Sequence, residues 1–106
     1  MKVAAHEILT LAAKLVKGDR AVTYGDMAIL HENIAILWNA WILVSRGIDP
    51  GLTAEDIAQM ESLLKKARTK SGEGTPDNYV DDAGYAGIAG ELSEAPEPKL
   101  IERSGG

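Results

Sequence analysis

The sequence contains no cysteine and only two histidines, His6 and His31, among its 106 residues. The absence of cysteine excludes disulfide bonds and thiolate metal sites. Two histidines alone cannot supply the ligands of a usual zinc site. The remaining candidate metal ligands are the oxygen atoms of the 16 Asp and Glu residues, which suit hard cations such as Mg²⁺.

Basic residues are also outnumbered, with 11 Lys and Arg against 16 Asp and Glu and a net charge of −5. Nonspecific binding to nucleic acid depends on clustered Lys and Arg that neutralise phosphates. Direct binding to nucleic acid is therefore not expected, and a polyphosphate ligand would need a bridging cation.

Several familiar motifs are missing. The sequence has no GxxxxGK phosphate loop, no HExxH motif and no GxSxG nucleophile turn. Its N-terminal apolar stretch is interrupted by His6, Glu7 and Lys14, unlike a secretory signal peptide. The longest apolar run, residues 34–44, contains Asn39 and is too short to cross a bilayer. We therefore expect a soluble, cytoplasmic protein that does not enter a membrane.

Apolar spacing predicts four helices. They cover residues 3–17, 27–46, 54–70 and 76–92. Residues 93–106 are rich in proline and charge, so an extended tail is expected after a single helical domain of residues 1–92. The predicted fold is all-α, a four-helix antiparallel bundle completed by oligomerisation through the second and fourth helices.

The helix predicted for residues 27–46 is apolar nearly all round, which is typical of a helix in a core or an oligomer interface. Its exceptions Glu32, Asn39 and Arg46 are seven residues apart and share one narrow stripe. Glu32 is interpreted equally well as a solvated residue and as a ligand. His31 fits a satisfied, partly buried histidine better than a lone ligand.

In the helix of residues 54–70, apolar spacing predicts a buried stripe. The stripe comprises Ile57, Met60, Leu64 and Ala67, with Leu63 beside it. Asp56 fits a capping box at the helix start, although it also shares a side with apolar residues. Glu61 and Lys65 have the i, i+4 spacing of a helix-supporting ion pair. Lys65 and Arg68 lie near the helix end, where cations suit the dipole.

The segment PDNYVDDAGYAGIAGE, residues 76–91, carries three acids and a run of glycine and alanine. Asp77 falls in the first turn, where an acid favours helix initiation. Asp81 lies beyond the reach of capping and in line with apolar residues, so it must be solvated, paired or bound to a cation. Asp82 points away and is expected to be exposed. The small residues predict the close approach of another helix.

Acids on different helices could converge inside the bundle. The candidate metal ligands are Glu32, Asp56, Asp77 and Asp81, of which Asp56 and Asp81 are the candidate catalytic residues. Such oxygen ligands suit Mg²⁺ or Mn²⁺, which can bridge nucleotide phosphates and activate a water for attack at phosphorus. Candidate phosphate-binding residues are Lys65, Arg68 and Arg20, and Tyr24, Tyr85 or Trp38 could stack on a base.

Four blocks of sequence resemble a family of small phage and prophage proteins of unknown function. The blocks are GDRAVTYGD, HENIAILWNAW, EDIAQMESLLKKAR and DNYVDDAGYAGIAGE, within roughly residues 8–92. That family resembles nucleotide-modification-associated domains and, more distantly, the MazG-like all-α nucleoside triphosphate pyrophosphohydrolases. The resemblance implies Mg²⁺ held by acids from adjacent helices and assembly as dimers or tetramers. It points to His31, Asp56, Lys65, Arg68, Asp77, Asn78, Asp81 and Tyr85.

Two classes of function follow. The leading hypothesis is a Mg²⁺-dependent protein that binds a nucleotide or another phosphorylated small molecule, with pyrophosphohydrolase activity in phage nucleotide metabolism as its catalytic form. Nucleotide sequestration without turnover is a variant of it. The alternative is a non-enzymatic phage interaction or assembly protein whose acids are helix caps. The alternative is favoured because the helix of residues 27–46 offers only Glu32, where MazG-like enzymes have a Glu-x-x-Glu pair.

Overall fold

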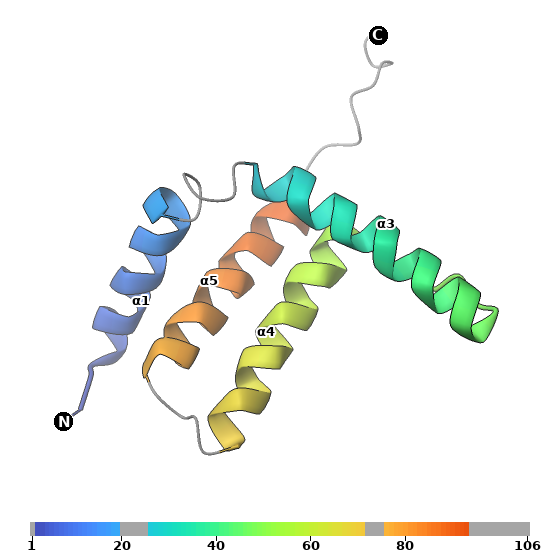
Figure 1. The fold of residues 1–106 in the computed structure, drawn as a ribbon. Coiled ribbons are helices and arrows are strands. Elements are labelled where there is room, and N and C mark those ends of the chain that lie inside the picture. The colour runs from blue at the N-terminus through green and yellow to red at the C-terminus, as the bar shows by residue number, and fades with distance from the viewer. Residues whose placement is uncertain (1, 20–25, 72–75, 94–106) are drawn as a thin grey trace, which may run out of the picture.

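The computed structural model describes residues 2–19, 26–71 and 76–93, and all regular structure in these ranges is helical (Figure 1). The elements are α1 (Ala5–Lys14), the short π-helical segment η1 (Leu15–Asp19), α3 (Met27–Arg46), α4 (Ala54–Lys70) and α5 (Pro76–Ser93). The prediction of an all-α chain is confirmed for these ranges. Residues 94–106 of the predicted tail lie outside them.

Local sequence signals explain where the helices begin and end. The carboxylate of Asp26 accepts hydrogen bonds from the N–H groups of Ala28 and Ile29 and so caps α3. Gly47 ends α3 in the left-handed conformation, at φ 75°, which glycine adopts without steric cost. Pro76 begins α5, where its missing N–H leaves no helical hydrogen bond unmade. These boundaries agree with the sequence-based prediction.

The first helix ends differently from the prediction. Gly18 is expected to stop it, but α1 continues into η1, and the wider π-helical turn contains Gly18. The turn lies against α5, because a Cβ atom built on Gly84 would be 3.4 Å from Cγ2 of Val16. Cβ atoms built on Gly87 and Gly90 would meet nothing within 4 Å. The predicted close helix contact is therefore found at Gly84 and not at the other two glycines.

In Figure 1, α5 lies between α1 and α4, and α3 runs across one end of α5 and α4. The antiparallel helices α4 and α5 share the most extensive contact of any two described elements. The C-terminal part of α3 projects beyond α4 (Figure 1). The four helices do not lie side by side within one chain, so the predicted four-helix antiparallel bundle is not confirmed.

The core is small and contains mostly short side chains. Ala58 of α4 meets Ile88 and Ala89 of α5, and all three are at most 3% exposed. Partly buried apolar side chains from η1, α3 and α5 surround them. Because hydrophobic stabilisation scales with the apolar area buried, at roughly 25 cal/mol per Å², alanine contributes less than a larger side chain would. Much of the chain's apolar area remains outside this core.

The predicted buried stripe of α4 is largely exposed. Met60, Leu63 and Leu64 are 37%, 61% and 59% exposed. The residues of α4 that are buried instead include Ala58 and Ser62. Ile57, at 0% exposed, confirms the first position of the stripe. The prediction is wrong for the residues after it, because periodicity identifies an apolar face of a helix but not whether the same chain covers that face.

Candidate functional site

Four of the predicted site residues meet along the contact between α4 and α5. Lys65 Nζ lies 3.1 Å from Asp81 Oδ2, with side chains 20% and 22% exposed. Arg68 Nε donates a hydrogen bond to Asn78 Oδ1 at 3.2 Å, and Asn78 is 5% exposed. We call these four residues, together with the cluster described next, the polar seam.

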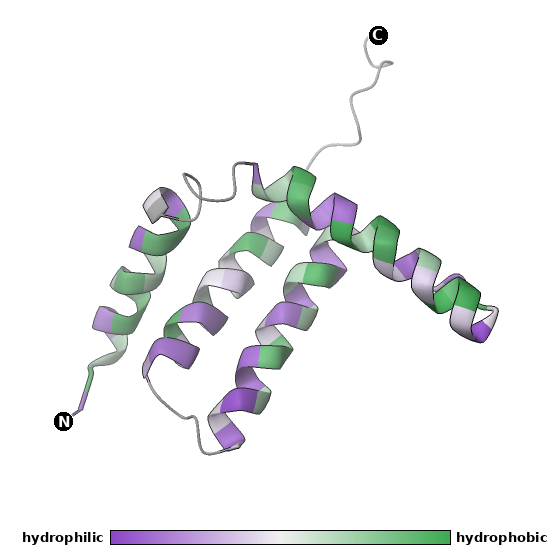
Figure 2. Ribbon diagram, in the orientation of Figure 1, coloured by the Kyte–Doolittle hydropathy of each residue, from purple (hydrophilic) through white to green (hydrophobic). Residues whose placement is uncertain are grey.

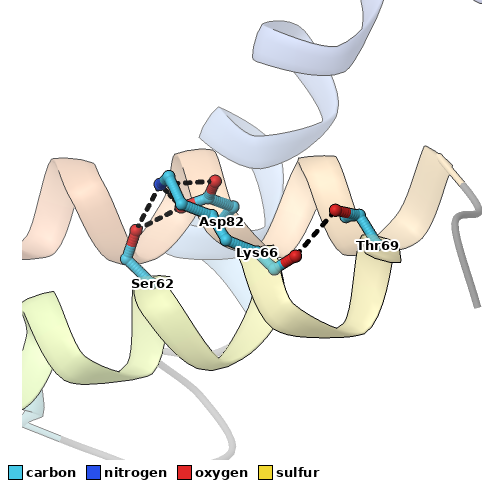
Figure 3. Close-up of polar contacts among 4 residues, drawn as sticks. All are labelled: Ser62, Lys66, Thr69 and Asp82. Carbon is cyan, nitrogen blue, oxygen red and sulfur yellow. Dashed lines mark hydrogen bonds and ion pairs between the residues drawn. The ribbon is translucent and has the colours of Figure 1, made fainter. Parts of the chain in front are cut away.

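A second cluster on the polar seam is not predicted by the sequence (Figure 3). Lys66 Nζ donates to the two carboxylate oxygens of Asp82, at 2.9 and 2.8 Å, and to Ser62 Oγ at 3.0 Å. The Ser62 hydroxyl donates to Asp82 Oδ1. The side chain of Asp82 is 18% exposed, so the expectation that it faces solvent is wrong. One sequence feature points to this cluster. Ser62 and Lys66 have i, i+4 spacing, which places both side chains on one side of α4.

The same cluster lowers the pKa of Asp82. Burial disfavours the carboxylate and raises its pKa, but the hydrogen bonds from Lys66 and Ser62 and the positive charge of Lys66 outweigh burial. The pKa of Asp82 is held below its ordinary value of 3.8. The cluster therefore links α4 to α5 through an ionised carboxylate that accepts from both Lys66 and Ser62.

His31 joins α3 to α4. Its side chain is fully buried, with Nδ1 2.8 Å from the Met27 carbonyl oxygen and Nε2 2.7 Å from Glu61 Oε1. The interpretation of His31 as a satisfied, buried histidine is confirmed. Because Glu61 contacts His31 and Lys65 contacts Asp81, the predicted Glu61–Lys65 pair is wrong.

The other predicted acids lie apart from the polar seam. Asp56 Oδ2 accepts from the N–H and hydroxyl of Thr53, at 2.9 and 3.1 Å, which completes the predicted capping box. Asp77 is exposed in the first turn of α5, and Glu32 is exposed on α3. Within residues 2–19, 26–71 and 76–93, no three His, Asp or Glu side chains form a group that could hold a metal ion. The predicted ligand set is therefore not assembled within one chain.

The aromatic and loop candidates are scattered. Tyr85 is partly buried against the core beside Ile88. Trp38 is 40% exposed on α3. Arg20 and Tyr24 lie outside the described residues. An apolar groove of about 440 Å³ lies between α1 and α5, and none of the predicted site residues lines it.

α3 carries half of the large apolar side chains that are exposed among the described residues. Figure 2 shows hydrophobic residues along most of its length. Leu37, Trp41 and Val44 are 67%, 69% and 80% exposed, whereas His31 and Ala35 are buried within the chain. Among the described residues, α3 therefore has one side covered by the rest of the chain and another side on which large apolar side chains are exposed.

By length and composition alone, α3 would also be able to cross a membrane. A single helix of this kind is weak evidence for membrane insertion, since the core helix of a soluble protein passes the same test. Polar contacts fix α3 to its own chain. Besides the His31 pair, Asn39 donates to the Leu52 carbonyl at 3.0 Å and accepts from the Leu52 N–H at 2.8 Å.

Two curated relatives are proteins of mycobacteriophages, each named "Gene 55 protein". The protein of Mycobacterium phage L5 is 44% identical over 90 residues, which are 85% of this chain and 54% of the relative. The protein of Mycobacterium phage D29 is 30% identical over 91 residues, or 86% and 56%. The chain thus spans about half the length of these relatives. No solved structure matches it significantly. These relatives place the chain among small phage proteins of unknown function. A family model described as "Domain of unknown function (DUF6378)" matches residues 7–93, and the chain therefore belongs to the DUF6378 family.

Proposed function

We propose that this protein is a phage interaction or assembly protein whose docking element is α3. The observation that carries the proposal is the exposure of large apolar side chains, 67% for Leu37, 69% for Trp41 and 80% for Val44. Contiguous apolar surface of this kind marks an interaction site. Each such side chain that a partner buries fully contributes roughly 1.5–3 kcal/mol, so a few of them suffice for a stable contact.

The attachment of α3 to its own chain suits a docking role. The His31–Glu61 contact holds α3 to α4, and the two hydrogen bonds of Asn39 hold the loop that follows α3. A helix held in one orientation loses less conformational freedom on binding than a free segment does. The apolar face is therefore presented in a preorganised form.

The predicted catalytic acids have structural partners that explain them without a reaction. Asp56 caps α4, and Asp81 forms an ion pair with Lys65. These roles are the ones expected of acids in an interaction protein. They favour assembly over hydrolysis as the function of this chain.

A photo-crosslinking amino acid at Val44 tests the proposal, with the same amino acid at Leu11 of α1 as a matched control. Both positions are exposed, by 80% and 46%. In bacteria that express the phage genes, we expect a light-dependent covalent adduct with a protein from position 44 and little or none from position 11. Equal adducts from both positions, or no protein adduct from position 44, would contradict a docking role for α3.

A second candidate function is the binding of a nucleotide or another phosphorylated small molecule, in the manner of MazG-like proteins. It is supported by the presence of Lys65, Arg68 and Asn78 on one polar seam. Lys and Arg side chains form charge-assisted hydrogen bonds with phosphate oxygens. Binding would require Lys65 to exchange Asp81 for phosphate. Because one chain does not assemble a metal-holding group among its described residues, we assign no step to Mg²⁺ or Mn²⁺.

Thermal unfolding with a panel of nucleoside triphosphates, with and without Mg²⁺, tests this second candidate alongside an assay for pyrophosphate release. A ligand at 100 times its Kd should stabilise the protein by about 2.7 kcal/mol. Lys65→Ala should abolish the stabilisation, and Lys70→Ala, an exposed position on the same helix, should keep it. If no nucleotide raises Tm and none is hydrolysed, the polar seam is purely structural.

A further inference from the structure

We infer that α3 packs antiparallel against α3 of a second copy of this chain, about a two-fold axis near the middle of the helix. The inference rests on the proposed docking role of α3 and names the partner. It also assigns the contact to α3 alone, whereas the sequence predicts oligomerisation through the second and fourth helices.

The exposed apolar residues of α3 have the spacing of a helix that packs along another helix. Ile29, Ile36 and Leu43 are seven residues apart, and so are Leu37 and Val44. A seven-residue repeat keeps side chains on one stripe that faces a partner helix along its whole length. The pattern therefore favours a long helix as the occupant of this face.

This stripe lies away from the side of α3 that contacts the rest of the chain. At 100° per residue, Ile36 is about 140° around the helix from the buried His31. Between the two apolar rows stands Ala40, which is exposed and small enough to let a second helix come close. The covered and uncovered faces of α3 are thus separate, and docking does not require the chain to unfold.

The charges on α3 favour an identical, antiparallel partner. Glu32 and Arg46 are both exposed, fourteen residues or about four helical turns apart, and nearly on the same side. The midpoint between them is residue 39, and the exposed apolar residues of α3, from Ile29 to Val44, have their midpoint between residues 36 and 37, less than one helical turn away. A two-fold axis at that point places Glu32 of each copy beside Arg46 of the other. In a parallel pair, Glu32 of one copy and Arg46 of the other would stand about four helical turns apart along the axis and would not meet.

The exposed apolar side chains also suit a dimer interface. Six of those on α3 are Ile29, Ile36, Leu37, Trp41, Leu43 and Val44. The same six from the second copy would complete the apolar centre of an interface, to which each partner ordinarily contributes roughly 800 Å². A membrane is the less favoured occupant, because Glu32, Asn33 and Arg46 are exposed on the same helix and would approach hydrocarbon.

Sedimentation equilibrium of the purified full chain, combined with charge reversal, tests the arrangement. Glu32→Arg or Arg46→Glu alone places like charges together at two symmetric positions. Each single variant should weaken association by roughly 3- to 10-fold in Kd. The double variant Glu32→Arg/Arg46→Glu should restore the wild-type Kd to within about twofold, since opposite charges then meet again. Circular dichroism checks that all variants keep their helix content.

The outcomes separate this inference from the proposed function. A double variant as weak as the single variants would overturn the antiparallel register. A monomeric wild type would overturn self-association, and a position-44 adduct with a different protein would then leave the docking role of α3 intact. Wild type that remains monomeric and binds vesicles of phosphatidylcholine and phosphatidylglycerol would assign the face to a membrane and overturn the inference.

Discussion

His31 Nε2 lies 2.7 Å from Glu61 Oε1, while Nδ1 of the same ring lies 2.8 Å from the Met27 carbonyl oxygen. A carbonyl oxygen and an ionised carboxylate only accept hydrogen bonds. The buried ring therefore stands between two hydrogen-bonding oxygens, one on its own helix α3 and one on α4. The contact with Glu61 is a side-chain link between the two helices.

Substitutions at the His31–Glu61 contact should separate the loss of packing from the loss of one hydrogen bond. His31→Ala leaves a cavity and two unsatisfied acceptors and should lower the free energy of unfolding by roughly 2–4 kcal/mol. Glu61→Gln keeps a hydrogen-bonding side chain of the same size beside the ring and should cost less than about 1 kcal/mol. Urea denaturation measures both, with His6→Ala at an exposed position as the control. A His31→Ala protein as stable as wild type would show that the His31–Glu61 contact does not hold α3 to α4.

The polar seam should make stability depend on acid. Folding lowers the pKa of Asp82 below 3.8, so the unfolded chain takes up a proton more readily than the folded chain. The stabilisation is present above the ordinary pKa and is lost as the pH falls through the folded pKa. Asp82→Asn should therefore be less stable than wild type at pH 7, and the difference should shrink below about pH 4.

Denaturation curves for both proteins at several pH values measure this dependence. Glu91→Gln, at an exposed position on the same helix, is the matched control and should show no such change. A stability difference for Asp82→Asn that stays constant from pH 7 to acid would contradict a role for the ionised carboxylate.

The start of α4 offers a test of Asp56 as a cap. Asp56→Ala and Thr53→Ala should each cost about 0.5–2 kcal/mol of stability, because each removes capping hydrogen bonds. Since the two side chains form one capping box, the double variant should cost clearly less than the sum of the two single losses. Thermal or urea unfolding gives the double-mutant cycle. Strict additivity would mean that Asp56 acts independently of Thr53.

The outer face of α3 should tolerate charge as far as folding is concerned. Leu37→Glu and Val44→Glu change side chains that are 67% and 80% exposed, so the single chain should keep its helix content and unfold with little change in stability. Association should be lost. Leu11→Glu on α1 serves as the control and should leave association unchanged. Unfolding of the α3 variants would indicate that this face is buried inside the chain itself.

The helix boundaries could be predicted because their causes are local. Asp26, Gly47 and Pro76 act through the adjacent backbone, and the residues that they affect are a few positions away. The satisfied state of His31 could also be inferred, although its partner Glu61 could not. A partner thirty residues away along the chain depends on how α3 crosses α4, and no spacing in the sequence specifies that crossing.

The polar seam was only partly predictable for a related reason. Asp81 and Asp82 are neighbours, and periodicity assigns just one of them to a buried side. In the structure both contact α4, where Asp81 pairs with Lys65 and Asp82 pairs with Lys66. Two adjacent acids of α5 can both contact α4 when two adjacent lysines of α4 lie opposite them. Whether the lysines lie opposite depends on how each helix is rotated about its own axis. The same rotation exposes Met60, Leu63 and Leu64, which the sequence places on the buried side of α4.

The molar mass of the purified wild-type chain, followed by light scattering across a dilution series, tests the docking of α3 on a second copy most directly. We predict a mass of twice 11.3 kDa at high concentration that falls toward 11.3 kDa on dilution, with the Leu37→Glu/Val44→Glu variant folded and at 11.3 kDa throughout. A wild-type mass of 11.3 kDa at every concentration would contradict it.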